Sequence, residues 1–133
     1  MSGLPRRWPP LALAGLFAGS GVLHLVRPDL YVALIPRPLP APDTIILASG
    51  VAELLCAAGL VTGRRWAGWA SALLLVVILP GNITFAIDVA RDPTSAPRLV
   101  ALAWLRLPLQ GPLIWAALQA RPAAGRQDDR VAQ

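Results

Sequence analysis

The chain has 133 residues, of which 56% are hydrophobic and only 14% are charged, and its formal net charge is +5. A soluble domain carries about a quarter of its residues as charged side chains, so this composition argues for a protein embedded in lipid. The chain has arginine but no lysine, and its arginines mostly flank apolar segments and form no long run, which argues against nucleic acid as a partner. The length allows one domain.

Four apolar segments follow one another, and each approaches the roughly 20 residues that a helix needs to span a bilayer. The predicted segments are 9–26, 43–62, 66–87 and 98–120. Arg6 and Arg7 precede the first segment, as in a secretory signal peptide. Three further segments follow, so we expect the first to be retained as a membrane helix, with cleavage as the alternative.

Short connectors join these segments. The stretch 27–42 contains five prolines, which fix φ and lack a backbone donor, and we expect it to be an extended, stiff cover. A tight turn at Gly63, Arg64 and Arg65 makes the second and third segments an antiparallel hairpin. The expected organisation is a cytoplasmic N-terminal segment, 1–8, a four-helix transmembrane domain, 9–120, and a flexible cytoplasmic tail, 121–133.

The distribution of arginines orients the predicted helices, because cytoplasmic loops of membrane proteins carry an excess of basic residues. One side holds Arg6, Arg7, Arg64, Arg65, Arg121, Arg126 and Arg130, and the other holds Arg27, Arg37, Arg91 and Arg98. We therefore predict an all-α fold, an integral membrane antiparallel four-helix bundle with both termini in the cytoplasm. The absence of lysine is typical of a GC-rich bacterial genome, so the expected location is the bacterial inner membrane.

Hydrophilic side chains inside the apolar segments are the candidate functional residues. A charge in hydrocarbon is expensive, so each needs a partner, a watery cavity or a function. The candidates for ligand binding or proton handling are His24, Ser49, Glu53, Asn82, Arg106 and Gln110. At a rise of about 1.5 Å per residue they fall between the midplane and the outer face. Because Arg106 is the strong cation at the depth of Glu53, we expect these two residues to form an ion pair.

Two interpretations of this polar set stay open. A buried ion pair often serves only to fix helix register. The alternative is a pair that also lines a ligand or proton site, which the number of polar groups favours. Pro80 and Pro108 are expected to interrupt the third and fourth segments beside these groups, as happens around cavities in membrane proteins.

The remaining chemistry-bearing residues are few. Cys56 is the single cysteine, so the chain has no intramolecular disulfide and no Cys-x-x-Cys pair. One histidine, one cysteine and a distant carboxylate do not make a metal site, and none is expected. Tryptophans near the segment ends, such as Trp8, are expected to anchor at the membrane interface. The deeper Trp104 and Trp115 are candidates to face a flat aromatic ligand.

From about residue 10 to 118 the chain resembles the DoxX family of small four-helix bacterial membrane proteins. The stretches that carry the resemblance are Gly21-Val-Leu-His24 with Arg27-Pro28, Ile35-Pro36, Leu39-Pro40, Ser49-Gly50-Val51-Ala52-Glu53-Leu54, Pro80-Gly81-Asn82 and Leu105-Arg106-Leu107-Pro108-Leu109-Gln110. Alanine is more usual at Gly81, and this departure is expected to loosen the break in the third segment. The family takes its name from a subunit associated with thiosulfate:quinone oxidoreductase activity, so the resemblance implies a redox setting at the membrane.

The first expected function is an accessory or binding subunit that holds a quinone-like or other apolar small molecule for a membrane redox system. Arg106 and Gln110 would contact the ligand oxygens, Glu53 would handle protons, and His24 would connect to water. No covalent cofactor is expected; electrons would come from a redox partner protein, and a homo-oligomer stays open. The alternatives are a proton-coupled carrier, a stand-alone membrane enzyme, or a structural module.

Overall fold

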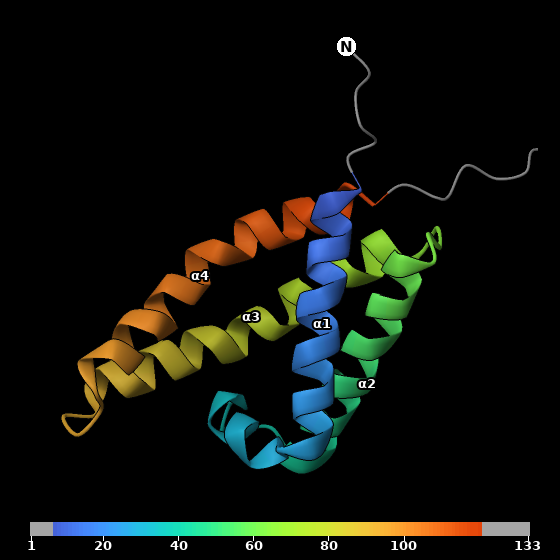
Figure 1. Ribbon diagram of the computed structural model, residues 1–133. Coiled ribbons are helices and arrows are strands. Elements are labelled where there is room, and N and C mark those ends of the chain that lie inside the picture. Colours follow the sequence, from blue (N-terminus) through green and yellow to red (C-terminus); the bar gives the residue numbers. More distant parts are fainter. Residues whose placement is uncertain (1–6, 121–133) are drawn as a thin grey trace, which may run out of the picture.

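The computed structural model describes residues 7–120, and every secondary-structure element in this part of the chain is a helix (Figure 1). Four long helices are present, α1 (Trp8–Val26), α2 (Pro42–Val61), α3 (Ala67–Arg91) and α4 (Pro97–Leu118), with a 3-10 helix, η1 (Pro28–Leu34), after α1. Each long helix is long and apolar enough to cross a membrane. The four predicted segments are confirmed as helices, and the largest boundary difference is the end of the third, predicted at 87 and found at Arg91.

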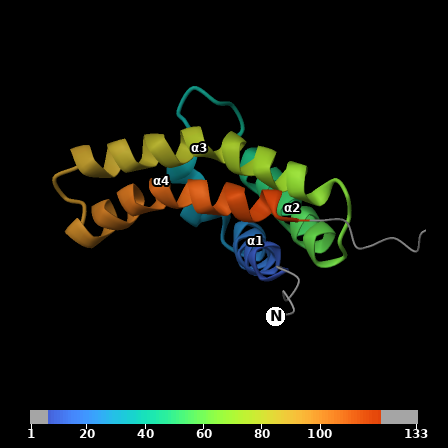
Figure 2. The ribbon, with the colours of Figure 1, turned by 90° about the horizontal axis from the view of Figure 1, so that it is seen from above.

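The long helices lie in two pairs. α1 runs beside α2 and α3 runs beside α4, and within each pair the chain direction reverses (Figures 1 and 2). The pairs meet where α1 begins and α4 ends. A core of Leu13, Phe17, Leu60, Leu75 and Ala117 joins all four helices there. Away from that end the two pairs separate, and η1 lies between them (Figure 1).

The predicted tight turn between the second and third segments is confirmed. Gly63 has φ 66°, a left-handed conformation that glycine adopts without a steric penalty. The amide of Arg64 donates to the carbonyl of Gly59 at 2.9 Å, and the amide of Gly63 donates to the carbonyl of Leu60 at 3.3 Å. These two bonds are the Schellman arrangement, which satisfies the last carbonyls of α2 and turns the chain directly into α3.

Two glycines allow α1 and α2 to cross at close range. A Cβ added to Gly50 would lie 2.7 Å from the His24 Cβ, and one added to Gly21 would lie 2.9 Å from the Gly50 carbonyl oxygen. Small residues at such a crossing let helix backbones approach in lipid. By contrast, nothing lies within 4 Å of a Cβ built on Gly15 or Gly19, so that glycine pair makes no helix contact.

The connector after α1 differs from its prediction. We expected 27–42 to be extended, but residues 28–34 form a 3-10 helix and Leu39 closes a turn on the carbonyl of Pro36. Pro28 occupies the start of η1, where its fixed φ and missing N–H are tolerated, and no further proline follows until Pro36. At the same junction the Arg27 guanidinium donates two hydrogen bonds to Asp29, which lowers the pKa of that carboxyl.

The prolines do not interrupt the long helices, so that expectation is wrong. α3 continues through Pro80, and α4 continues through Pro108 and Pro112. Near the first of these, the Thr84 hydroxyl donates to the Pro80 carbonyl at 2.9 Å. Gly81 has a packing role: a Cβ there would collide with the Leu34 carbonyl oxygen of η1. The glycine therefore lets η1 rest on α3, where we had expected a looser break.

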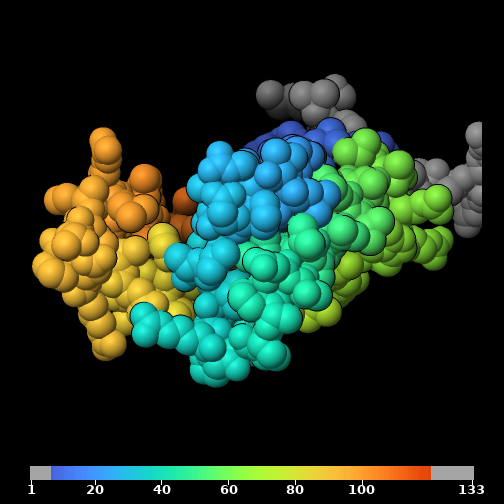
Figure 3. All heavy atoms as spheres, turned by 90° about the horizontal axis from the view of Figure 1, so that it is seen from below, coloured from blue at the N-terminus to red at the C-terminus, as the bar shows by residue number. Residues whose placement is uncertain are grey.

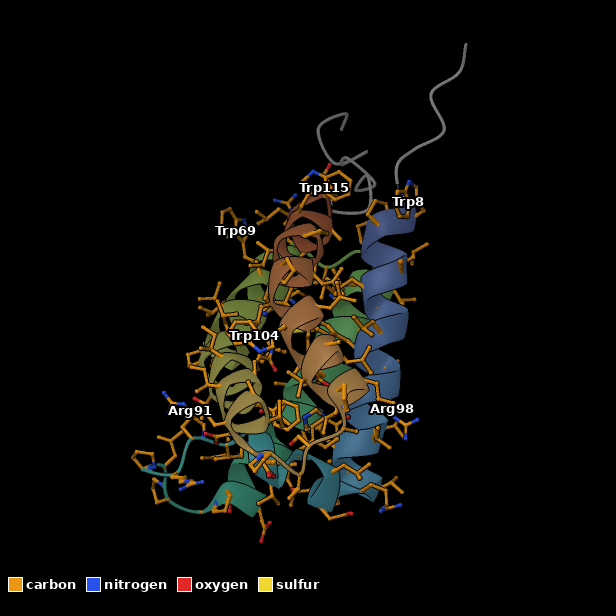
Figure 4. All side chains as sticks on the ribbon, turned by 90° about the vertical axis from the view of Figure 1, so that its left-hand side faces the viewer. Trp8, Trp69, Arg91, Arg98, Trp104 and Trp115 are labelled. Atoms are coloured by element: carbon orange, nitrogen blue, oxygen red, sulfur yellow. The ribbon has the colours of Figure 1, made fainter. Side chains whose placement is uncertain are left out.

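Large apolar side chains cover the outer surface of the long helices, as expected for contact with lipid. Trp8, Trp69 and Trp115 lie toward the end where the pairs meet, whereas Arg91 and Arg98 lie toward the opposite end (Figure 4). Trp115 is thus nearer a helix end than we predicted, while Trp104 is at middle depth. Residues 1–6 of the predicted N-terminal segment and the predicted tail, 121–133, lie outside the described residues. The same holds for four of the arginines that were predicted to lie on the cytoplasmic side, Arg6, Arg121, Arg126 and Arg130.

Candidate functional site

A cavity of about 250 Å³ lies between the two helix pairs, under η1. Most of its lining is apolar, including Leu34, Ile46 and Ile78. The polar and charged residues that line it are His24, Tyr31, Ser49, Glu53, Asn82 and Arg106. They come from all four long helices and from η1. Figure 3 shows the connector, in light blue to teal, spread over this end of the molecule beside the yellow residues of α3.

Five of the six predicted site residues therefore meet at one cavity. His24, Glu53 and Asn82 are also buried, with exposed fractions of 7%, 4% and 3%. Arg106 lines the cavity but is exposed on its other sides. These five groups share a depth, as helix rise predicted, and the helices are rotated so that each of them faces the cavity.

The buried acid contacts a different base from the one we predicted. The His24 Nδ1 lies 3.4 Å from the Glu53 Oε2, and within residues 7–120 no salt bridge joins Glu53 to Arg106. The predicted ion pair between Glu53 and Arg106 is therefore wrong, although both residues line the same cavity. The reason is the glycine crossing at Gly50, which presses α2 against α1 beside His24. The chain contains one histidine and one glutamate, and the fold places them in contact.

The hydrogen bonds of His24 fix where its ring proton lies. Nδ1 is 2.8 Å from the Ser20 carbonyl oxygen, which can only accept, so Nδ1 carries the proton. In neutral imidazole the other nitrogen, Nε2, is then an acceptor. The Tyr31 ring stacks on the imidazole with a centroid distance of 3.6 Å and an interplanar angle of 25°. Ser20 and Tyr31 thus set the tautomer and the orientation of the ring.

Two buried polar atoms on cavity residues have no hydrogen-bond partner within the described chain. They are Oε2 of Glu53 and Nδ2 of Asn82. The contact of Glu53 with His24 does not satisfy Oε2, because the Nδ1 proton is directed to Ser20. Buried polar groups are almost always paired, so each orphaned atom needs an explanation such as a bound molecule or water.

Gln110 does not line the cavity, contrary to its predicted role. Its side-chain amide is buried and donates to the Leu75 carbonyl of α3. The residue therefore joins α4 to α3 and is a packing contact.

Replacing Gln110 with leucine is expected to lower the free energy of unfolding by about 1 kcal/mol, because one interhelical hydrogen bond is lost. Ligand binding in the cavity should not change. Unfolding in detergent, compared with the Gln119→Leu control at the end of α4, measures the effect. A loss of ligand binding at unchanged stability would contradict the packing role.

Two residues of the site, Tyr31 and Ser20, were not predicted from the sequence. Tyr31 is the single tyrosine of the chain, and it was overlooked because the connector that carries it was predicted to be extended. Ser20 lies one helical turn before His24, and this spacing could have indicated the contact. Trp104 and Trp115 are not among the cavity residues, so the geometry gives no support to their predicted ligand contact. Cys56 is buried in the apolar core.

Comparison with known proteins adds a family but no activity. No curated protein and no solved structure shows significant similarity to this chain. One family model, described as a domain of unknown function (DUF8561), matches residues 13–121, which include α2, α3 and α4 in full and every residue of the cavity. The chain therefore belongs to the DUF8561 family.

Proposed function

We propose that this protein is a DoxX-like accessory or binding subunit of a membrane redox system, and that its cavity holds the head group of a quinone-like molecule. The observation that carries the proposal is the pair of orphaned polar atoms, Glu53 Oε2 and Asn82 Nδ2, on residues of an apolar cavity. Apolar walls with a few convergent polar groups are the usual form of a small-molecule site.

The size of the cavity supports the binding of a ring-sized head group rather than of a whole lipid-soluble quinone. Drug-sized ligands occupy pockets of about 300–1,000 Å³, and this cavity, at about 250 Å³, is slightly smaller. A ring system fits within it, while an isoprenoid tail would lie outside among the lipid chains. Arg106, exposed at the cavity edge, is placed to donate to a ring oxygen.

The membrane setting is part of the same proposal. Four apolar helices in reversing pairs support a four-helix bundle in the bacterial inner membrane. Arg64 and Arg65 lie at the α2–α3 turn, whereas Arg91 and Arg98 lie at the other end of α3 and α4. The arginines of the N- and C-terminal segments of the sequence belong with Arg64 and Arg65, and this excess on one side supports cytoplasmic termini. The chain carries no electron-transfer motif, so a redox partner protein would supply electrons.

A proton-coupled carrier or a stand-alone enzyme is the second candidate. The buried contact between His24 and Glu53 favours it, because ionisable residues inside a membrane often form proton relays. Uptake into proteoliposomes driven by a pH gradient would support the carrier over the binding subunit. An accessory subunit should show ligand binding without such uptake.

Ser49→Phe is expected to abolish binding of 1,4-naphthoquinone, because a phenyl ring at this position fills the cavity that Ser49 lines. The matched control is Ala48→Phe, the next residue of α2, which is exposed and does not line the cavity. Quenching of tryptophan fluorescence in detergent micelles measures the binding. Equal quinone affinity in both variants would reject the proposed function.

A further inference from the structure

Two buried residues that line the cavity carry unsatisfied hydrogen-bonding atoms of opposite kinds. As a carboxylate, Glu53 can only accept, and its Oε2 has no donor. The Asn82 Nδ2 can only donate, and it has no acceptor. Both side chains are more than nine-tenths buried, so neither orphan is satisfied by bulk solvent.

His24 adds to the acceptors. Because its Nδ1 proton is held by the Ser20 carbonyl, the neutral ring can offer only Nε2, which accepts. No side-chain hydrogen bond within residues 7–120 uses Nε2. The α1–α2 wall of the cavity is therefore rich in acceptors, and the donors Asn82 and Arg106 come from α3 and α4.

A ligand that satisfies this arrangement must bring a donor as well as an acceptor. A quinone offers only carbonyl oxygens, so it could pair with Asn82 or Arg106 but would leave Glu53 Oε2 buried without a partner. A hydroxylated ring satisfies both walls, because its O–H donates and its oxygens accept. A buried acceptor that stays unpaired keeps its full desolvation penalty. The hydroxylated ring removes this penalty at Glu53 and the quinone does not, so the site should favour the hydroxylated ring.

We infer that the cavity selects the reduced, hydroxylated form of its ligand, a quinol or phenol, over the oxidised quinone. In this arrangement the ligand hydroxyl donates to Glu53, and a ring oxygen accepts from Asn82. This inference rests on the proposed function, that the cavity holds a quinone-like ring, and it names the redox state that the site retains.

The test compares two probes of the same ring, 1,4-dihydroxynaphthalene and 1,4-naphthoquinone, titrated anaerobically into the detergent-solubilised full chain. A hydrogen bond to a charged group contributes about 1.5–3 kcal/mol, so the quinol is expected to bind at least about tenfold more tightly. Glu53→Gln replaces an acceptor by an amide that also donates, and it should reduce or reverse this preference. Asp43→Asn, the same acid-to-amide change outside the cavity on α2, should retain it.

The outcomes separate the two claims. Equal binding of both probes, or tighter binding of the quinone, overturns the inference and leaves quinone binding intact. Failure of both probes to bind removes the proposed function and the inference with it. If Glu53→Gln does not fold, as a thermal unfolding scan will show, the comparison of the two probes on the unmodified protein decides the question.

Discussion

Replacing Gly50 with alanine is expected to force α1 and α2 apart and to lower the free energy of unfolding by about 1–3 kcal/mol, the usual cost of overpacking. The added Cβ would lie 2.7 Å from the Cβ of His24 and 3.1 Å from the Gly21 carbonyl oxygen. Neither neighbour is the end of a flexible side chain, so the helices themselves must move. The contact between His24 and Glu53 should lengthen, and ligand affinity should fall with it.

Two other glycines supply the control for this experiment. Gly15→Ala and Gly19→Ala place a Cβ where nothing lies within 4 Å, and alanine favours a helix by about 1 kcal/mol over glycine. These variants should be as stable as the parent protein or more stable. Denaturant unfolding monitored by circular dichroism in one detergent compares all three. If Gly50→Ala behaves like the two controls, the close crossing of α1 and α2 is not a feature of the folded protein.

Replacing His24 with leucine is expected to destabilise the protein by about 1–3 kcal/mol, because the buried carboxylate of Glu53 loses the polar group that contacts it. Glu53→Leu should cost less, because a neutral imidazole keeps its hydrogen bond to the Ser20 carbonyl. The double variant, in which both groups are apolar, should recover much of the loss. The coupling energy from this double-mutant cycle, measured by unfolding, reports the interaction directly.

The corresponding cycle between Glu53 and Arg106 is the matched comparison. No salt bridge joins these residues in the described chain, so Arg106→Leu and Glu53→Leu should show a smaller coupling than the His24 cycle. If the coupling energy of Glu53 with Arg106 is larger than that with His24, the ion pair predicted from helix depth is present after all. That result would also mean that His24 is mainly a packing residue against Tyr31.

The helices were predictable because lipid imposes a simple rule on sequence. Every backbone group must be paired within the segment, so a spanning element appears as about 20 apolar residues bounded by charge or proline. This rule placed α1 to α4 closely. It does not apply to the connector, where five prolines suggested extended chain and the structure forms η1. There, the stretch between Pro28 and Pro36 is long enough for a short helix that packs on its neighbours.

The members of the site were predictable, but their contacts were not. Helix rise gives the depth of a side chain, and depth correctly grouped His24, Glu53 and Asn82. Which base meets the acid depends on the rotation of each helix about its own axis, and this was set by the close approach at Gly21 and Gly50. The same limit explains Gln110, which has the right depth but is directed to the backbone of α3.

The acid–base contact joins two long helices that follow one another along the chain, α1 and α2. Glu53 therefore meets its partner inside the α1–α2 hairpin, and this contact requires neither α3 nor α4. A glutamate entering lipid alone would be costly, and a neighbour only one helix earlier in the chain shortens the time it spends uncompensated. A contact between neighbouring helices thus lowers the cost of burying Glu53 in lipid, and α3 and α4 add the remaining polar groups of the cavity.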